Sequence, residues 1–316
     1  MASRGMPLDT AAIFSTAMEG ILYGFSVLMF VGTMWALTRK RRMKEINRTN
    51  TAVAFMLLIL STAHMIVDIV RLEQGLVTYR DTFPGGPAAF FADVTQITFV
   101  VKNIMYSLQT MLGDGMVIYR CYVVWQSVWI IIAPSLLWIA MTVCAFCADY
   151  KLSNATSEAG DVFAKPTGQW ITAFYTMSLA SNLLASGCLA YRIWRMERNI
   201  SAIRTSNKSM MPIVRVLADA AILYSVTILT GLVCFVEANN GQYIILDMTM
   251  PIISIAFYMI IIRMAMKTTR YNNTSTIGMG TETAREIPQQ YYMKRMPVEV
   301  HISQVTHQDE TSKLAY

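Results

Sequence analysis

Several ionisable and amide side chains interrupt the long apolar segments of this chain, and they are its first candidates for chemistry. His64 and Asp68 lie four residues apart in one apolar segment, so they share a face if that segment is a helix. Lys102, Tyr106 and Gln109 form a second stripe at helical spacing. A charged group at the centre of a bilayer costs about 2.5 to 3.5 kcal/mol on insertion scales. Each of these groups therefore needs a partner, a cavity or a function.

Two interpretations of these residues are open, and both also include Glu19 and Asp247 from other apolar segments. In the first, the side chains line an outward-facing pocket in which Lys102 or a carboxylate binds a charged ligand. In the second, they form ion pairs between helices, such as Lys102 with Glu19 or Asp68, that only specify packing. Arg71, three residues after Asp68, is a further local partner for that carboxylate.

A second set of polar residues lies toward the other end of the same segments. Asp114 and Arg120 follow the Lys102 stripe, and Asp219 lies in a later segment. An arginine facing an acid on a neighbouring helix forms a link that can break when a bundle changes state. The alternative is that Arg120 extends to the lipid headgroups and local hydroxyls satisfy Asp219. Arg195 and Arg198, in the next basic loop, are candidates for contact with a cytoplasmic partner.

No residue set in the sequence predicts catalysis or metal binding. Cys144 and Cys147 have C-x-x-C spacing, but they lie in an apolar segment without a second pair or a histidine partner. Of the three histidines, only His64 falls in an apolar segment, which disfavours a membrane hydrolase. We therefore expect no enzyme activity, no metal and no cofactor.

The elements that position these residues are apolar segments long enough to cross a membrane. Hydrophobic residues make up 54% of the 316 residues and charged ones only 15%, against about 25% in an average soluble protein. A helix needs about 20 residues to cross the hydrocarbon core. Seven segments qualify, at residues 11–37, 51–72, 92–118, 128–147, 169–191, 213–236 and 243–262.

The sequence thus predicts an all-α bundle of seven transmembrane helices. Residues 1–10 form a short external N-terminus without a removable signal peptide, and 263–316 form a disordered cytoplasmic tail. Residues 119–127 make a tight turn between the third and fourth helices. The third helix carries polar groups around much of its circumference, so we expect it at the centre of the bundle.

Basic residues orient the predicted bundle. Most of the 26 Lys and Arg residues fall in the first and third predicted internal loops and in the tail, which places those segments in the cytoplasm. The N-terminus is then outside. The sequon at Asn154 falls in an external loop, and we expect it to be the only glycosylated asparagine. The expected location is the plasma membrane.

One segment, residues 113–125, carries a resemblance to a known family. Its distinctive residues are Gly113, Asp114, Tyr119, Arg120, Cys121, Tyr122 and Trp125. With the seven predicted helices around it, the segment resembles the large family of uncharacterised heptahelical membrane proteins expanded in mushroom-forming fungi. The resemblance covers roughly residues 10–265 and implies a receptor-like protein without a settled ligand. The motifs of retinal proteins and of rhodopsin-class receptors are absent from the sequence.

We expect a receptor of the general kind that couples to G proteins. Its ligand would be a small molecule, a lipid or a short peptide bound in the outer half of the bundle, because the external loops are short. A heterotrimeric G protein or another cytoplasmic signalling protein is the expected partner, and pairing with a second copy stays open. The alternative is a small-solute transporter. The net charge is +6, but the basic residues lie beside the apolar segments and no nucleic-acid-binding motif accompanies them. We therefore expect no nucleic-acid binding.

Overall fold

The computed structural model describes residues 6–38, 48–154, 165–201 and 211–277, and within them the chain is helical, with no strand. The α-helices are α1 (Leu8–Thr38), α2 (Arg48–Glu73), α3 (Gly86–Ala92), α4 (Ile97–Trp125), α5 (Val128–Ser153), α6 (Lys165–Ser201), α7 (Met211–Val236) and α8 (Gly241–Ile277). A short π-helix, η2 (Gln74–Thr78), continues α2. The all-α prediction is confirmed for these residues.

Five helical stretches are long and apolar enough to cross a membrane, which indicates a multi-pass membrane protein. They are Leu8–Thr38, Arg48–Thr78, Val128–Ser153, Arg215–Val236 and Gly241–Ala265. The helices α4 and α6 have 29 and 37 residues but do not reach the same apolarity. Large apolar side chains such as Leu28, Ile59 and Leu136 are exposed on the bundle, as a lipid-facing surface requires.

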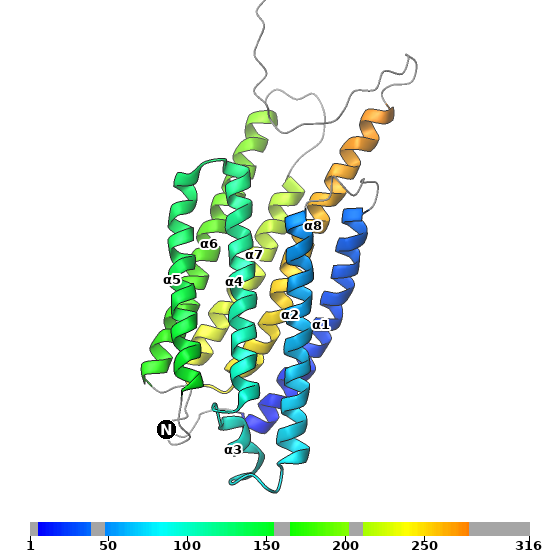
Figure 1. Cartoon of the computed structure of the whole chain (residues 1–316). Helices are drawn as coiled ribbons and strands as arrows, with labels where there is room; N and C mark the ends of the chain where they lie inside the picture. The colour runs from blue at the N-terminus through cyan, green and yellow to red at the C-terminus, as the bar shows by residue number, and fades with distance from the viewer. Residues whose placement is uncertain (1–5, 39–47, 155–164, 202–210, 278–316) are drawn as a thin grey trace, which may run out of the picture. The chain divides into compact units, whose positions relative to one another are not determined.

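The described parts of the long helices up to residue 273 belong to one compact unit, in which they pack as an antiparallel bundle (Figure 1). The last described residues of α8, 274–277, belong to a second unit. Within the bundle α4 contacts α2, α5 and α6 directly, and its side chains also reach α8. The central position predicted for this helix is therefore confirmed.

The helix α8 is also central, which the sequence did not indicate. Of its most apolar stretch, 61% is buried, against 22 to 33% in the other four candidate spans. A helix that is apolar all round gives no signal about which face it buries. Here Met250, Ile253, Tyr258 and Ile261 fill the core, and the Tyr258 hydroxyl donates a hydrogen bond to the Ala54 carbonyl on α2.

Two predicted boundaries around α4 are wrong. The third helix begins at Ile97, not near residue 92, because residues between α3 and α4 form a turn in which Asp93 Oδ1 accepts hydrogen bonds from the amide and hydroxyl of Thr95. Its other end continues to Trp125, so the turn to α5 consists of Gln126 and Ser127 rather than residues 119–127. Gln126 adopts a left-handed φ of 54°, which ends the helix abruptly.

Candidate functional site

Lys102 on α4 lies between two buried carboxylates. Its Nζ is 2.7 Å from Asp68 Oδ1 on α2 and 2.7 Å from Asp247 Oδ1 on α8. All three side chains are buried. The structure thus contains the Lys102–Asp68 ion pair, one of the two pairings of Lys102 predicted from the sequence. Asp247 is a second partner of Lys102 that was not predicted as one. No ion pair joins Lys102 to Glu19 in the described part of the chain.

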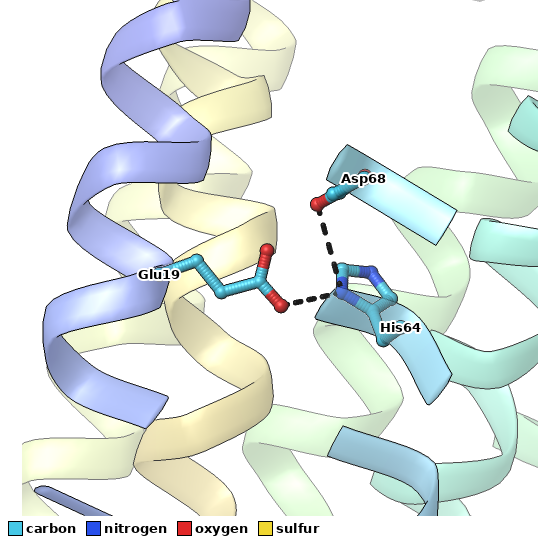
Figure 2. A group of neighbouring side chains, drawn as sticks. All are labelled: Glu19, His64 and Asp68. Atoms are coloured by element: carbon cyan, nitrogen blue, oxygen red, sulfur yellow. Dashed lines mark hydrogen bonds and ion pairs between the residues drawn. The ribbon is translucent and has the colours of Figure 1, made fainter. Parts of the chain in front are cut away.

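Glu19 instead contacts His64, as Figure 2 shows. His64 Nδ1 is 2.7 Å from Glu19 Oε1 and 3.7 Å from Asp68 Oδ2, so the imidazole lies between carboxylates from α1 and α2. Their exposed fractions are 1% for Glu19, 0% for His64 and 3% for Asp68. The shared face predicted for His64 and Asp68 is confirmed.

These contacts join five side chains into one buried network, the Lys102 cluster, made of Glu19, His64, Asp68, Lys102 and Asp247. It connects four helices, α1, α2, α4 and α8. Glu19 Oε2, His64 Nε2 and Asp68 Oδ2 lack a hydrogen-bond partner among the described residues. The cluster therefore holds buried lone pairs that the protein alone does not satisfy.

A cavity lies beside the Lys102 cluster and reaches Asp68, Lys102 and Asp247. Its other walls come from α1, from the end of α2 and from Phe91, Phe99 and Tyr243, and it has room for only a few water molecules. Arg71 also lines it, but the predicted pairing of Arg71 with Asp68 does not occur among the described contacts. The guanidinium donates hydrogen bonds to Thr98 Oγ1 and the Phe91 carbonyl instead.

The other two residues of the predicted ligand stripe have structural contacts. Gln109 Nε2 donates hydrogen bonds to the Met250 carbonyl and to the hydroxyls of Ser61 and Ser254, which ties α4 to α2 and α8. Tyr106 packs against Phe174 on α6, with ring centroids 6.0 Å apart. Ser61 shares the face of His64 and Asp68 by its spacing, so the sequence contains a signal for its position, but Ser61 was not among the predicted site residues.

The second candidate set lies farther along α4. Asp114 Oδ2 accepts a 2.7 Å hydrogen bond from Ser178 on α6. Arg120 is 7% exposed, its Cζ lies 4.5 Å from the centre of the Phe257 ring, and its Nε and Nη2 have no hydrogen-bond partner among the described residues. Both residues line a second cavity, the Arg120 cavity, whose walls come from α4, α6, α7 and α8.

The structure does not bring the remaining predicted residues to this cavity. Asp219 is exposed on α7, and no ion pair joins it to Arg120 in the described ranges. Arg195 and Arg198 are exposed near the end of α6. Asn154 is exposed immediately after α5. A role for these residues in coupling or glycosylation stays a prediction.

One ionisable group outside the long helices has a shifted pKa. Partial burial raises the pKa of Asp93, but hydrogen bonds from the side chain and amide of Thr95 and from Gln96 outweigh it, so the net pKa is below its ordinary value. The Asp93 carboxylate thereby stabilises the turn that precedes α4.

No protein-family model, curated protein or solved structure matches this chain. The interpretation of the site therefore depends on its residues and their geometry.

Proposed function

We propose that the chain is a receptor-like plasma-membrane protein with seven transmembrane helices, similar to the heptahelical family of mushroom-forming fungi. In this proposal α4 and α6 cross the bilayer together with the five more apolar helices. The basic segments then lie in the cytoplasm, and the N-terminus lies outside.

The observation that carries the proposal is the placement of two buried polar sites on one helix. Lys102 and Arg120 are about 27 Å apart along α4 at 1.5 Å per residue. The Lys102 cluster would lie in the outer half of the membrane and the Arg120 cavity in the inner half. A ligand at the first site can therefore influence a cytoplasmic protein at the second through one rigid element.

The state of Arg120 supports a switching role. A buried guanidinium that leaves two nitrogens without hydrogen bonds carries an energetic penalty. An acceptor on a cytoplasmic partner would relieve that penalty, so the partner would bind best to a bundle that opens this cavity. The cavity beside the Lys102 cluster has room for only a few water molecules. A small molecule, lipid or short peptide would therefore have to widen it, and this would reposition α2, α4 and α8.

The test is nucleotide exchange by a heterotrimeric G protein mixed with the purified chain in lipid nanodiscs. We expect the wild-type chain to accelerate basal exchange of GDP for GTPγS, and Arg120→Ala to abolish the acceleration without reducing surface expression. Arg80→Ala changes an exposed arginine outside the long helices and serves as the matched control. Acceleration that survives Arg120→Ala would contradict the proposed role of this residue.

A small-solute transporter is the second candidate, favoured by the chain of buried charges that connects four helices. Buried ion pairs that exchange partners can act as a gate for a charged solute. The test is tracer flux into liposomes that contain only this protein. Flux that is unchanged in Lys102→Ala, Asp68→Ala and Asp247→Ala would exclude the Lys102 cluster as the transport site.

A further inference from the structure

The donor atoms of Glu19, His64 and Asp68 converge on one small region inside the bundle. One ligand atom from each residue lies within 4.8 Å of the other two, and all three side chains are buried. Figure 2 shows the Glu19 and Asp68 side chains approaching the same edge of the His64 ring from different sides. We propose that these three residues form a binding site for a divalent transition-metal ion, with Zn²⁺ as the best fit.

The distances suit a first coordination shell with small adjustments. Bonds of about 2.0 to 2.1 Å in a tetrahedral zinc site separate the ligand atoms by about 3.3 Å. The 2.7 Å and 3.7 Å distances from His64 Nδ1 to the two carboxylates lie on either side of that value. An imidazole nitrogen with two carboxylate oxygens favours Zn²⁺ over Mg²⁺ or Ca²⁺, and the absence of a thiolate from this set disfavours Cu(I).

One of the three ligand atoms, Asp68 Oδ2, has no hydrogen-bond partner among the described residues. Asp68 divides its two oxygens, since Oδ1 pairs with Lys102 while Oδ2 faces His64 without a hydrogen bond. Lys102 thus orients the carboxylate from outside the coordination shell. Glu19 Oε2 is likewise without a hydrogen-bond partner among the described residues. Each oxygen is a buried acceptor that a cation would satisfy.

The charges of the neighbouring groups are compatible with a bound cation. Glu19, Asp68 and Asp247 carry three negative charges when ionised, whereas Lys102 and Arg71 supply two positive ones. A divalent ion with one bound hydroxide would make the set neutral. Protonation of Glu19 or of His64 would also make the set neutral, so the charge count permits a metal ion without requiring one.

The adjoining cavity lies next to the proposed site. Leu8, Ala12 and Ser15 line the cavity and share a face of α1 with Glu19 by their spacing. The cavity wall also includes Asp68, one of the three ligands. This site departs from the expectation of no metal, because the sequence could not place Glu19 of α1 against α2. It shares three residues with the Lys102 cluster, but zinc binding does not depend on the proposed receptor function, and the zinc titration tests it separately.

The experiment is zinc binding by the purified full chain without an affinity tag, stripped with a chelator and titrated with ZnCl₂ by calorimetry. We expect one ion per chain, and we expect Glu19→Gln, His64→Gln and Asp68→Asn each to weaken binding at least tenfold. Asp114→Asn alters an equally buried carboxylate on α4, outside the proposed site on α1 and α2, and this variant should bind zinc as the wild type does. Replacing the other two histidines, His301 and His307, with alanine should also leave the affinity unchanged.

X-ray absorption at the zinc edge keeps the proposal testable if a variant does not fold. The wild-type spectrum should show nitrogen and oxygen ligands only, with the scattering of one imidazole. The proposal is overturned if the stripped wild-type chain binds no zinc, if the spectrum contains sulfur or several imidazoles, or if folded Glu19→Gln and Asp68→Asn variants bind as tightly as the wild type.

Discussion

Lys102 is held by two buried carboxylates, and no other lysine or arginine forms an ion pair with them among the described residues, so its removal is costly. In Lys102→Met, Asp68 and Asp247 would remain buried without the ammonium group. Breaking a buried ion pair from one side typically destabilises a protein by about 3 to 5 kcal/mol. We expect a marked fall in the thermal unfolding temperature of the detergent-solubilised chain.

A second substitution separates the loss of charge from the loss of packing. The double variant Lys102→Met with Asp247→Asn removes one of the two stranded carboxylates, so it should recover part of the lost stability. If the double variant is no more stable than Lys102→Met alone, the Lys102–Asp247 contact does not carry the energy assigned to it.

The residues of the cluster show which contacts could be predicted from the sequence. Spacing along one helix places His64 and Asp68 together, because the geometry of the helix alone determines that relation. The contacts of Lys102 with Asp247 and of His64 with Glu19 join helices far apart in the sequence. They depend on how the bundle packs, and the same set of charges allowed several pairings.

At the scale of elements, the close approach of α4 and α8 depends on Gly113. A Cβ atom at this position would lie 2.8 Å from Ile253 Cγ2, and Ile253 is a buried residue of the core. We expect Gly113→Ala to lower stability by about 1 to 2 kcal/mol, because overpacking outweighs the better helix propensity of alanine. Thermal unfolding in detergent measures the change.

The matched control is Gly24→Ala on α1, where an added Cβ would meet no atom within 4 Å. This change should be neutral or slightly stabilising. Equal losses in both variants would show that glycine is needed for helix flexibility in general and not for the α4–α8 contact.

The helices also show why some boundaries were predicted well and others were not. Each predicted segment coincides with one long helix because apolar length is a strong signal. The start of α4 was placed five residues too early because Ala92 and Val94 extend the apolar composition of the sequence toward α3. The turn formed by Asp93 interrupts the backbone there, and such a turn leaves only a weak trace in composition.

At the scale of the whole molecule, the orientation in the membrane follows only from the distribution of basic residues. Internal packing does not depend on which side of the bilayer each end of the bundle faces. The effect of the basic residues on orientation arises from the membrane and its insertion machinery, and not from the packing of the helices. The orientation therefore needs a marker that only one side of the membrane can add.

Asn154 provides that marker, since it is exposed directly after α5 in an Asn-Ala-Thr sequon. We expect the chain made in a eukaryotic secretory pathway to carry one N-linked glycan, because the enzymes that add it face the lumen, which is equivalent to the outside of the cell. Digestion with an N-glycosidase should shift the wild-type band on a gel, and Asn154→Gln should remove the shift. Asn272→Gln, in a sequon on the proposed cytoplasmic side, should leave the shift intact. A glycan that persists in Asn154→Gln and disappears in Asn272→Gln would reverse the orientation and exchange the outer and inner assignments of the Lys102 cluster and the Arg120 cavity.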